Sequence, residues 1–231
     1  MSLKLGVPSK GRLMDKTVAW FARHGIELGR SGSEREYAGY VRGIEGVELV
    51  LLSAGEIPRE LATGRIHLGV TGTDLIREML GQWESQVEEM APLGFGQADL
   101  VIAVPRGWVD VTRLDDLDAA AAAFRVRHGV RLRIATKYHR LVREFLREAG
   151  VADYQLVDSQ GATEGTIKNE TAEAIADITS SGDTLRANHL RVLEDGLILK
   201  SQATLYRARA AELGDSERVT LGQLRARLGI D

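Results

Sequence analysis

Short apolar runs alternate with longer amphipathic segments along most of the chain. The short runs are rich in leucine, valine or isoleucine and end at glycine or polar residues, which is typical of buried β-strands. They occupy residues 3–8, 47–53, 66–72, 99–105, 131–136, 154–158, 172–178 and 197–208. Apolar residues three or four positions apart predict helices after the turn at 9–12, over 57–64, 114–129, 139–150 and 184–195, and from a cap at Thr73 or Asp74.

Strands that alternate with helices predict βαβ units, and therefore an α/β fold with mostly parallel sheets. The predicted strands are too many for one small sheet, and the segment 92–96 is the expected crossing point. We therefore predict two domains with a central cleft: domain I over residues 1–93 and from about residue 190 to 231, and domain II over residues 94–189. Ligands of such folds sit at the carboxyl ends of the strands. The segment after Ala208 predicts one or two charged helices with a peripheral role.

The composition excludes several classes of protein. The 231 residues carry a formal net charge of −3, so no excess of Lys and Arg exists to neutralise a nucleic-acid backbone. The absence of cysteine excludes disulfides and thiolate metal sites, and the five histidines show no metal-binding spacing. No apolar run has the length of a signal-peptide core or a membrane span, so we expect a cytoplasmic protein.

One turn combines the features of a phosphate-binding loop. The sequence "ADITSSGDTLRAN" (176–188) leaves a predicted strand at Asp177 and gives hydroxyl side chains and a glycine before a predicted helix. The glycine allows a tight turn with inward N–H groups, and the helix start adds donors. The candidate phosphate ligands are Thr179, Ser180, Ser181, Gly182, Asp183 and Thr184. An ordinary turn with a Ser or Thr cap fits the same residues, and Asp183 would repel a phosphate unless it points outward.

Cations follow the first predicted strand. The turn "PSKGRL" (8–13) places Lys10 and Arg12 at a helix start, where positive charge is unfavourable unless an anion lies near. A solvated turn fits these two residues as well. Arg35 lies among acids in "ERE" (34–36), and taken alone it fits a surface ion pair.

Three further turns carry polar or cationic residues after predicted strands. Gly72 and Asp74, in "GVTGTDLI" (69–76), fit either close approach of a ligand or a simple helix cap. Lys137 and Tyr138 follow the strand at 131–136, and Glu164 follows the strand at 154–158. Each turn is a weak signal by itself, but in the predicted fold all of them would face one cleft.

Taken in order, these motifs resemble the ATP phosphoribosyltransferase family. The stretches that carry the resemblance are "VPSKGRL", "EIPRELATGRIHLGVTGTDLI", "RIATKYHRLVREFL", "GATEGT" and "AIADITSSGDTLRANHL", and together they span about residues 3–206. The family transfers the phosphoribosyl group of phosphoribosyl pyrophosphate to ATP, with release of pyrophosphate, in the first step of histidine biosynthesis. The resemblance implies a two-domain fold similar to type II periplasmic binding proteins. The chain length resembles the short form of the family.

The resemblance also implies roles for particular residues. The loop from Asp177 to Thr184 matches the family's phosphoribosyl pyrophosphate loop, with Ser181 where the family often has threonine. Glu164 matches the acid of a neighbouring turn, although its surroundings here are more polar than is usual in the family. The implied catalytic cations are Lys10, Arg12 and Arg35, and the implied ATP-binding residues are Gly72, Asp74, Lys137 and Tyr138.

The resemblance further implies Mg²⁺ chelated chiefly by pyrophosphate, a homodimer, and a hetero-oligomer with a regulatory subunit similar to histidyl-tRNA synthetase. Two other functions fit the residues without it. One is a small-molecule binding module with no chemistry, and the other is a phosphoribosyltransferase that uses a different base.

Overall fold

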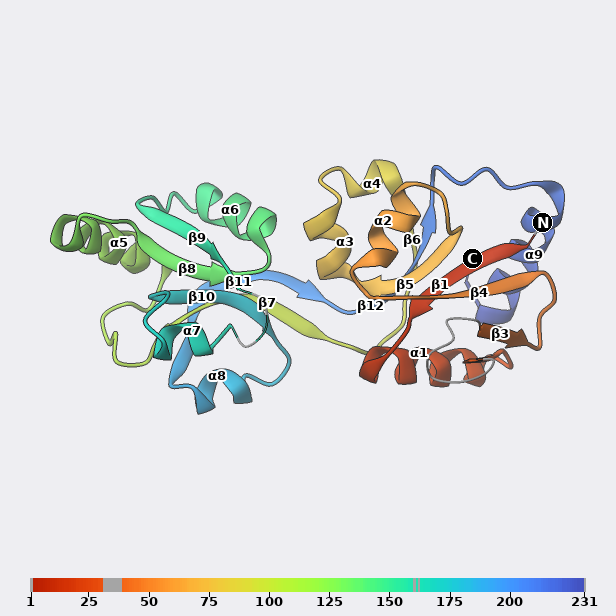
Figure 1. The fold of residues 1–231 in the computed structure, drawn as a ribbon, viewed down its shortest axis with the longest axis horizontal. Coiled ribbons are helices and arrows are strands. Elements are labelled where there is room, and N and C mark those ends of the chain that lie inside the picture. The colour runs from red at the N-terminus through yellow and green to blue at the C-terminus, as the bar shows by residue number, and fades with distance from the viewer. Residues whose placement is uncertain (1, 31–38, 160, 162, 231) are drawn as a thin grey trace. The chain divides into compact units, whose positions relative to one another are not determined.

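The computed structural model describes residues 2–30, 39–159, 161 and 163–230 (Figure 1). The chain divides into two compact units. Unit 1 comprises Met1–Gln97 and Gln202–Asp231, and unit 2 comprises Ala98–Ser201. Each unit is built around one five-stranded sheet. The predicted class, two α/β domains with mostly parallel sheets, is confirmed.

Unit 1 has a sheet in which one strand opposes the others. Its order is β4 (Val47–Leu52), β1 (Leu3–Pro8), β5 (Leu68–Gly72), β12 (Ala203–Ala208) and β6 (Val87–Pro92). β1 pairs in parallel with β4 and β5, whereas β12 is antiparallel to both of its neighbours. β2 (Glu27–Arg30) and β3 (Gly39–Arg42) form a separate antiparallel pair in this unit. Neither β6 nor this pair is among the predicted strands.

Helices cover both faces of this sheet, as Figure 1 shows for α1 and α2. One core joins alternate residues of β1 to α1 (Gly11–Arg23) and α9 (Asp215–Leu228), with Phe21 and Leu224 almost fully buried. The other core joins Tyr206 to α2 (Glu56–Ala62) and α3 (Thr73–Met79), beside the short α4 (Trp83–Gln86). Because Leu221, Leu224 and Leu228 lie in the first core, the predicted peripheral role of the C-terminal segment is wrong.

His67 extends the pairing of β1 with β5 through its side chain. Its N–H donates to the Lys4 carbonyl at 3.0 Å, and its Nδ1 accepts from the Lys4 N–H at 2.8 Å. The ring must therefore be unprotonated at Nδ1. Burial, the largest contribution, lowers the pKa of His67 below its ordinary value of 6.5.

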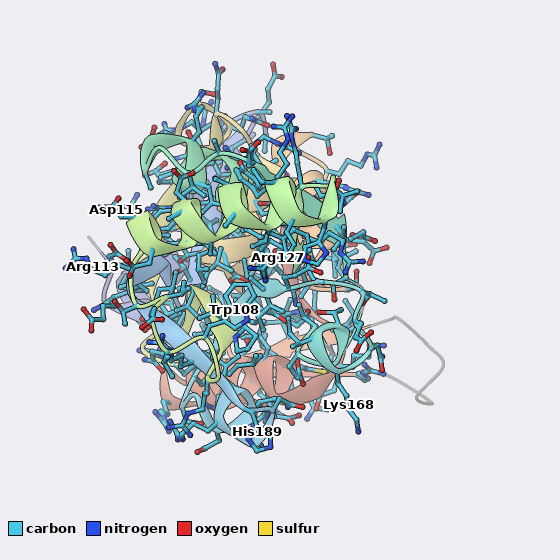
Figure 2. All side chains as sticks on the ribbon, turned by 90° about the vertical axis from the view of Figure 1, so that its left-hand side faces the viewer. Trp108, Arg113, Asp115, Arg127, Lys168 and His189 are labelled. Atoms are coloured by element: carbon cyan, nitrogen blue, oxygen red, sulfur yellow. The ribbon has the colours of Figure 1, made fainter. Side chains whose placement is uncertain are left out.

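Unit 2 repeats the layered arrangement. The sheet order is β11 (Leu190–Ser201), β7 (Ala98–Pro105), β10 (Ala174–Thr179), β8 (Leu132–Thr136) and β9 (Tyr154–Asp158), and β7 opposes the others. The helices are α5 (Leu114–His128), α6 (His139–Glu148), α7 (Gly165–Lys168) and α8 (Asp183–Ala187). Figure 2 shows α5 across the unit, with the exposed side chains of Asp115 and Arg127 at its surface.

The segment 184–208 differs most from prediction. The helix expected over 184–195 is limited to α8, because His189 has φ 56° and cannot continue a right-handed helix. β11 follows, and its irregular pairing with β7, which shifts register after Val192, buries both Leu190 and Leu193 although they lie three residues apart. The single strand expected over 197–208 is two strands in different sheets, separated at Gln202. Because β11 pairs with β7, the division of the chain falls at 201/202 rather than near residue 190.

Candidate active site

Three turns meet at the carboxyl edge of the unit 1 sheet. The register pairs Pro8 of β1 with Leu52 of β4, and β5 lies on the other side of β1. The turns after these strands are 9–12, 53–56 and 72–74, so parallel pairing makes them neighbours. This edge brings together the predicted residues Lys10, Arg12, Gly72 and Asp74. The predicted Arg35 lies outside the described residues.

Lys10 and Arg12 give this edge exposed positive charge. Lys10 is the residue that caps α1, but it makes no side-chain capping bond, and Arg12 follows in the first turn. No acidic residue stands in that turn, and both cations are exposed. Positive side chains at the positive end of a helix dipole repel the backbone, so an anionic ligand would relieve an unfavourable arrangement.

Asp74 is held in a nearly buried position at the start of α3. The cap of this helix is Gly72, without a side-chain capping bond, so the predicted cap at Thr73 or Asp74 is wrong. Thr73 instead ties the turn to β12, because its N–H donates to the Gln202 carbonyl at 3.1 Å and its Oγ1 accepts from the Tyr206 hydroxyl at 3.3 Å. Only 7% of Asp74 is exposed, so its position is fixed by rigid surroundings.

One of these three turns, residues 53–56, was not among the predicted site turns. The Ser53 N–H donates to Glu56 Oε2 at 2.8 Å, and the Glu56 N–H donates to the Ser53 carbonyl at 3.0 Å. Hydrogen bonds to the Glu56 carboxylate from the Ser53 side chain, the larger contribution, and from the Ser53 N–H lower the pKa of Glu56. The signal was available in "LLSAGEIP", where a serine follows a strand and a glutamate stands three residues later.

The carboxyl edge of the unit 2 sheet gathers the other candidates. Thr136 of β8 is in register with Asp158 of β9 and with Ala176 of β10. The turns that follow these strands are therefore neighbours, and these turns together with the end of β10 contain the remaining predicted residues. These are Lys137, Tyr138, Glu164, Asp177, Thr179, Ser180, Ser181, Gly182, Asp183 and Thr184.

The loop after β10 is closed by its own side chains. Gly182 has φ 73°, a left-handed conformation that favours glycine, and its N–H donates to Thr179 Oγ1 at 2.9 Å. Asp183 accepts from Ser181 Oγ at 2.6 Å and forms an ion pair with Arg186. These contacts, the Ser181 hydrogen bond first, lower the pKa of Asp183. Arg186 thus balances the carboxylate that would otherwise oppose a phosphate.

Asp177 and Thr184 flank this loop. Oδ1 of Asp177 accepts the N–H of Ile178 at 2.8 Å, so the carboxylate bends back over the end of β10. The Thr184 carbonyl accepts from the Asn188 side chain at 2.9 Å, which closes α8 within five residues. So short a helix has a weak dipole, and the loop amides and hydroxyls are the main donors available to an anion.

Lys137 and Tyr138 occupy different environments. Lys137 is exposed, with Nζ 5.1 Å from the centre of the Tyr138 ring. Tyr138 is only 1% exposed, and its N–H donates to Thr136 Oγ1 at 2.9 Å. The tyrosine therefore supports Lys137 from beneath, and its ring does not form part of the surface. Glu164 is half-buried at the start of α7 and makes no side-chain capping bond.

A histidine and a carboxylate also meet at this edge. His139 Nε2 lies 3.3 Å from Asp158 Oδ1. His139 is two residues after Lys137 in the sequence. His139 was not among the predicted site residues, since the histidines show no metal-binding spacing. The pair was detectable only by placing the two strand ends in register.

Two features are absent from the part of the chain that the structure describes. Within the described ranges, no group of three or more His, Asp or Glu side chains could hold a metal ion. No helix in the same ranges is long and apolar enough to cross a membrane.

Comparison with known proteins gives a consistent result. The family model described as "ATP phosphoribosyltransferase" (HisG) matches residues 53–228. The chain is 69% identical over 230 residues to the ATP phosphoribosyltransferase of Cereibacter sphaeroides, covering 100% of this chain and 97% of that protein. It is 49% identical to the ATP phosphoribosyltransferase of Rhodopseudomonas palustris, covering 96% of this chain and 70% of that protein.

Solved structures show the same fold at lower identity. One is the ATP phosphoribosyl transferase (HisG:HisZ) complex of Thermotoga maritima, with TM-score 0.73 and 20% identity over 98% of this chain and 96% of that chain. Another is the periplasmic aliphatic sulphonate binding protein SsuA of Escherichia coli, with TM-score 0.55 and 17% identity over 98% of this chain and 71% of that chain.

Proposed function

The chain belongs to the ATP phosphoribosyltransferase family, and from this premise we infer how its residues serve the family's reaction. The enzyme transfers the phosphoribosyl group of phosphoribosyl pyrophosphate to N1 of the adenine of ATP and releases pyrophosphate, the first step of histidine biosynthesis. Its length fits the short form of the family. The observation that carries this conclusion is the 69% identity across the whole chain.

We propose that the loop from Thr179 to Thr184 binds the 5′-phosphate of phosphoribosyl pyrophosphate. The left-handed turn at Gly182 supports this role, because successive main-chain amides in such a turn can converge on an anion. The N–H groups of Gly182 and Asp183 donate to Thr179 Oγ1 and Ser181 Oγ, and they would exchange these partners for phosphate. The hydroxyls of Ser180, Ser181 and Thr184 are exposed and offer further donors. The internal bond from Ser181 to Asp183 would exchange for a bond to phosphate, and Arg186 would then hold Asp183 alone.

Asp177 and Glu164 are the proposed ligands of the ribose hydroxyls. Both lie at the carboxyl edge of the unit 2 sheet, and neither is fully buried. Substitution at the anomeric carbon passes through an oxocarbenium-like state, with inversion. Carboxylates that hold the ribose would orient that carbon, and adenine N1 is a weak nucleophile for which orientation matters most.

The cations of unit 1 are the proposed partners of the polyphosphates. Lys10 and Arg12 lie exposed at the carboxyl edge of the sheet, with no acid in their turn. Their charge would stabilise the negative charge that builds on the departing pyrophosphate. Arg35 is proposed for the same role from its sequence position. Gly72, Asp74, Lys137 and Tyr138 are proposed for ATP, with Tyr138 acting through its support of Lys137.

Mg²⁺ is the proposed cofactor. The described residues offer no three-residue cage, and this donor set fits an ion held chiefly by pyrophosphate oxygens and water. When bound, the ion would neutralise charge on the leaving group. Lys10 and Arg12 would lie beside the metal–pyrophosphate complex and balance its remaining negative charge.

We also propose that the chain works in the cytoplasm, as a homodimer joined to a regulatory subunit similar to histidyl-tRNA synthetase. The likeness to the Thermotoga maritima chain, solved as a HisG:HisZ complex, supports the second subunit.

The decisive assay combines ATP, phosphoribosyl pyrophosphate and Mg²⁺ with the chain, with and without the partner subunit, and follows the ultraviolet absorbance of the product. Absorbance that requires both substrates supports the assignment. Binding of either substrate without turnover under both conditions would point to a binding module. Turnover with another base but not with ATP would identify a different phosphoribosyltransferase.

A further inference from the structure

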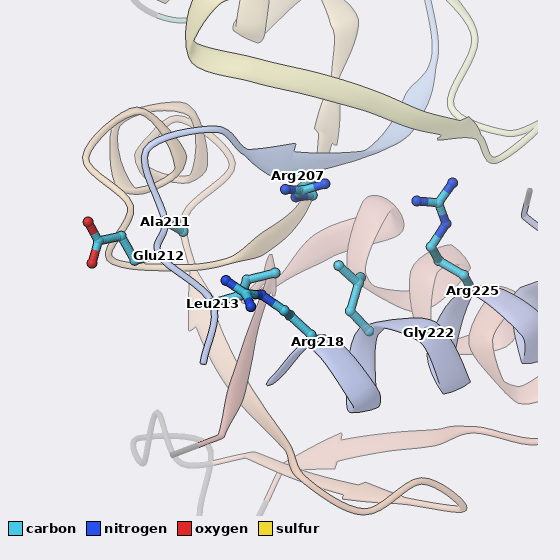
Figure 3. Close-up of a pocket in the computed structure, with 8 residues that line it drawn as sticks. Arg207, Ala211, Glu212, Leu213, Arg218, Gly222 and Arg225 are labelled. Carbon is cyan, nitrogen blue, oxygen red and sulfur yellow. The ribbon is translucent and has the colours of Figure 1, made fainter. Parts of the chain in front are cut away.

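A cavity of about 670 Å³ lies in unit 1 between β12, the segment 209–214 and α9 (Figure 3). We call it the α9 groove, and the lining residues used below are Arg207, Leu213, Arg218, Leu221, Gly222 and Arg225. Arg207 is in register with Leu68 and Glu88, which begin or nearly begin β5 and β6. The groove therefore lies toward the amino edge of the sheet, away from the candidate substrate residues at the carboxyl edge.

The groove combines guanidinium groups with an apolar wall. Figure 3 shows Arg207 on β12 and Arg218 and Arg225 on α9 around one opening, with the carboxylate of Glu212 directed away from them. Leu213 and Leu221 supply apolar surface to the same opening. An inorganic anion needs no apolar wall, whereas a peptide segment with both carboxylates and apolar side chains would use both kinds of surface.

Two of these arginines pair with acids of the same unit. Arg207 lies 3.3 Å from Glu88 in a part-buried pair, and Arg218 lies 3.5 Å from the fully exposed Asp215. The exposed pair of Arg218 contributes little to stability, so its exchange for a carboxylate of another chain costs little. Arginine is also the cation best suited to paired hydrogen bonds with a carboxylate.

Gly222 points to close approach by another backbone. It lies inside α9, four residues after Arg218 and three before Arg225, so all three share one face of the helix. A Cβ built at Gly222 meets no heavy atom within 4 Å. Packing within the chain thus gives no reason for a glycine, which is less favourable than alanine inside a helix. The missing side chain leaves helix backbone open between two guanidinium groups.

We propose that the α9 groove docks an acidic segment of the partner subunit. The proposal rests on the proposed function, which includes that subunit. Carboxylates of the segment pair with Arg218 and Arg225, and an apolar side chain of the segment lies over Gly222 against Leu221. Docking here leaves the carboxyl edge of the sheet open to substrate.

The test measures binding of the purified partner subunit from the same organism by calorimetry and sedimentation velocity. The double variant R218E/R225E should weaken binding at least about tenfold, because charge reversal in a buried interface costs more than loss of a rim contact. R218Q/R225Q, which retains side-chain bulk, should weaken it less. The matched control is R127E, which reverses an exposed charge on α5 and should leave binding within about twofold.

A second pair of variants separates docking from helix stability. G222A should raise the melting temperature, because alanine favours the helix and its Cβ enters open space. G222W should fill the groove and abolish subunit binding while affinity for phosphoribosyl pyrophosphate is retained. That affinity, measured on the isolated chain, tests the transferase assignment separately and reports folding of each variant.

Three outcomes would overturn the proposal. The first is subunit binding by R218E/R225E and G222W equal to that of the unaltered chain. The second is no binding of the subunit by the unaltered chain, even where phosphoribosyl pyrophosphate binds normally. The third is a change in self-association of the chain with no change in subunit binding, which would make a second copy the occupant.

Discussion

Alanine at Gly182 tests the proposed phosphate loop through its backbone alone. The residue has φ 73° and ψ 2°, the left-handed region in which a Cβ meets the following carbonyl. The new Cβ would lie 3.0 Å from Nη1 of Arg186, the flexible end of a side chain that can move. The substitution therefore changes the preferred loop conformation without placing a bulky group in the site.

The strain sets the size of the effect. A non-glycine residue in this conformation costs about 1–2 kcal/mol. If the loop keeps its shape, unfolding of G182A requires that much less free energy. If the loop relaxes instead, binding must restore the left-handed turn, and the dissociation constant for phosphoribosyl pyrophosphate rises about 5- to 30-fold. The losses in stability and in binding free energy should together come to about 1–2 kcal/mol.

The matched control is G150A in the same unit. Gly150 has φ 76°, and a Cβ there meets nothing within 4 Å, so the backbone strain is comparable. It follows the carboxyl end of α6, at the opposite edge of the sheet from the loop. Urea unfolding, monitored by circular dichroism, should show that G150A loses about 1–2 kcal/mol of free energy of unfolding. Calorimetry should show that its affinity for phosphoribosyl pyrophosphate is unchanged. If G182A matched the unaltered chain in both measurements, the described loop conformation could not be what binds phosphate.

Three further perturbations have definite expected outcomes. R12A should lower kcat about 100-fold or more while changing the free energy of unfolding by less than about 0.5 kcal/mol, because Arg12 is exposed and is proposed to act on the leaving group; steady-state kinetics and urea unfolding measure the two effects. Stability should fall as the pH is lowered below 6.5, because the unfolded chain protonates His67 more readily than the folded chain does; urea midpoints of the unaltered chain and of H67N, which cannot titrate there, measure this. L224A should reduce the free energy of unfolding by about 2–4 kcal/mol, because the deleted atoms leave a cavity in the unit 1 core; urea unfolding measures it.

Each perturbation has a control or a result that contradicts it. R23A removes an exposed arginine from the other end of α1 and should keep full turnover, whereas unimpaired kcat in R12A at saturating substrates would remove Arg12 from the catalytic assignment. If H67N lost stability below about pH 6.5 as steeply as the unaltered chain, the loss would belong to other groups. V219A trims the exposed side of α9 and should be nearly neutral; a comparable loss there would mean that α9 does not pack as described.

Sequence patterns predicted the parts of the fold in which local and tertiary preferences agree. The runs at 3–8 and 154–158 are β1 and β9 to the residue, because a short apolar run between turns has few alternatives. The helix predicted over 184–195 from Leu185, Leu190 and Leu193 is wrong beyond α8. The left-handed His189 and pairing of β11 with β7 decided in favour of a strand, and neither can be read from spacing.

The candidate site shows the same limit: the positions of its turns could be predicted from the sequence, whereas burial and contacts between strands could not. Strand ends located the turns of each unit, since parallel pairing within a sheet brings its turns to one edge of that sheet. Burial was less accessible from sequence: Tyr138 was an implied ATP-binding residue, yet core packing leaves only 1% of it exposed. The pairing of Asp183 with Arg186 follows from helical geometry three residues apart and was detectable. That of His139 with Asp158 depends on the order of strands in the sheet.

The position of β12 has a consequence for synthesis of the protein. It lies between β5 and β6, although the ribosome produces it after all of unit 2. Unit 2 is one continuous stretch and can close its sheet while translation continues. The unit 1 sheet stays split, with β6 separated from β5, until residues 203–208 leave the exit tunnel, so a nascent chain arrested before that point would expose two unpaired strand edges for chaperones to shield.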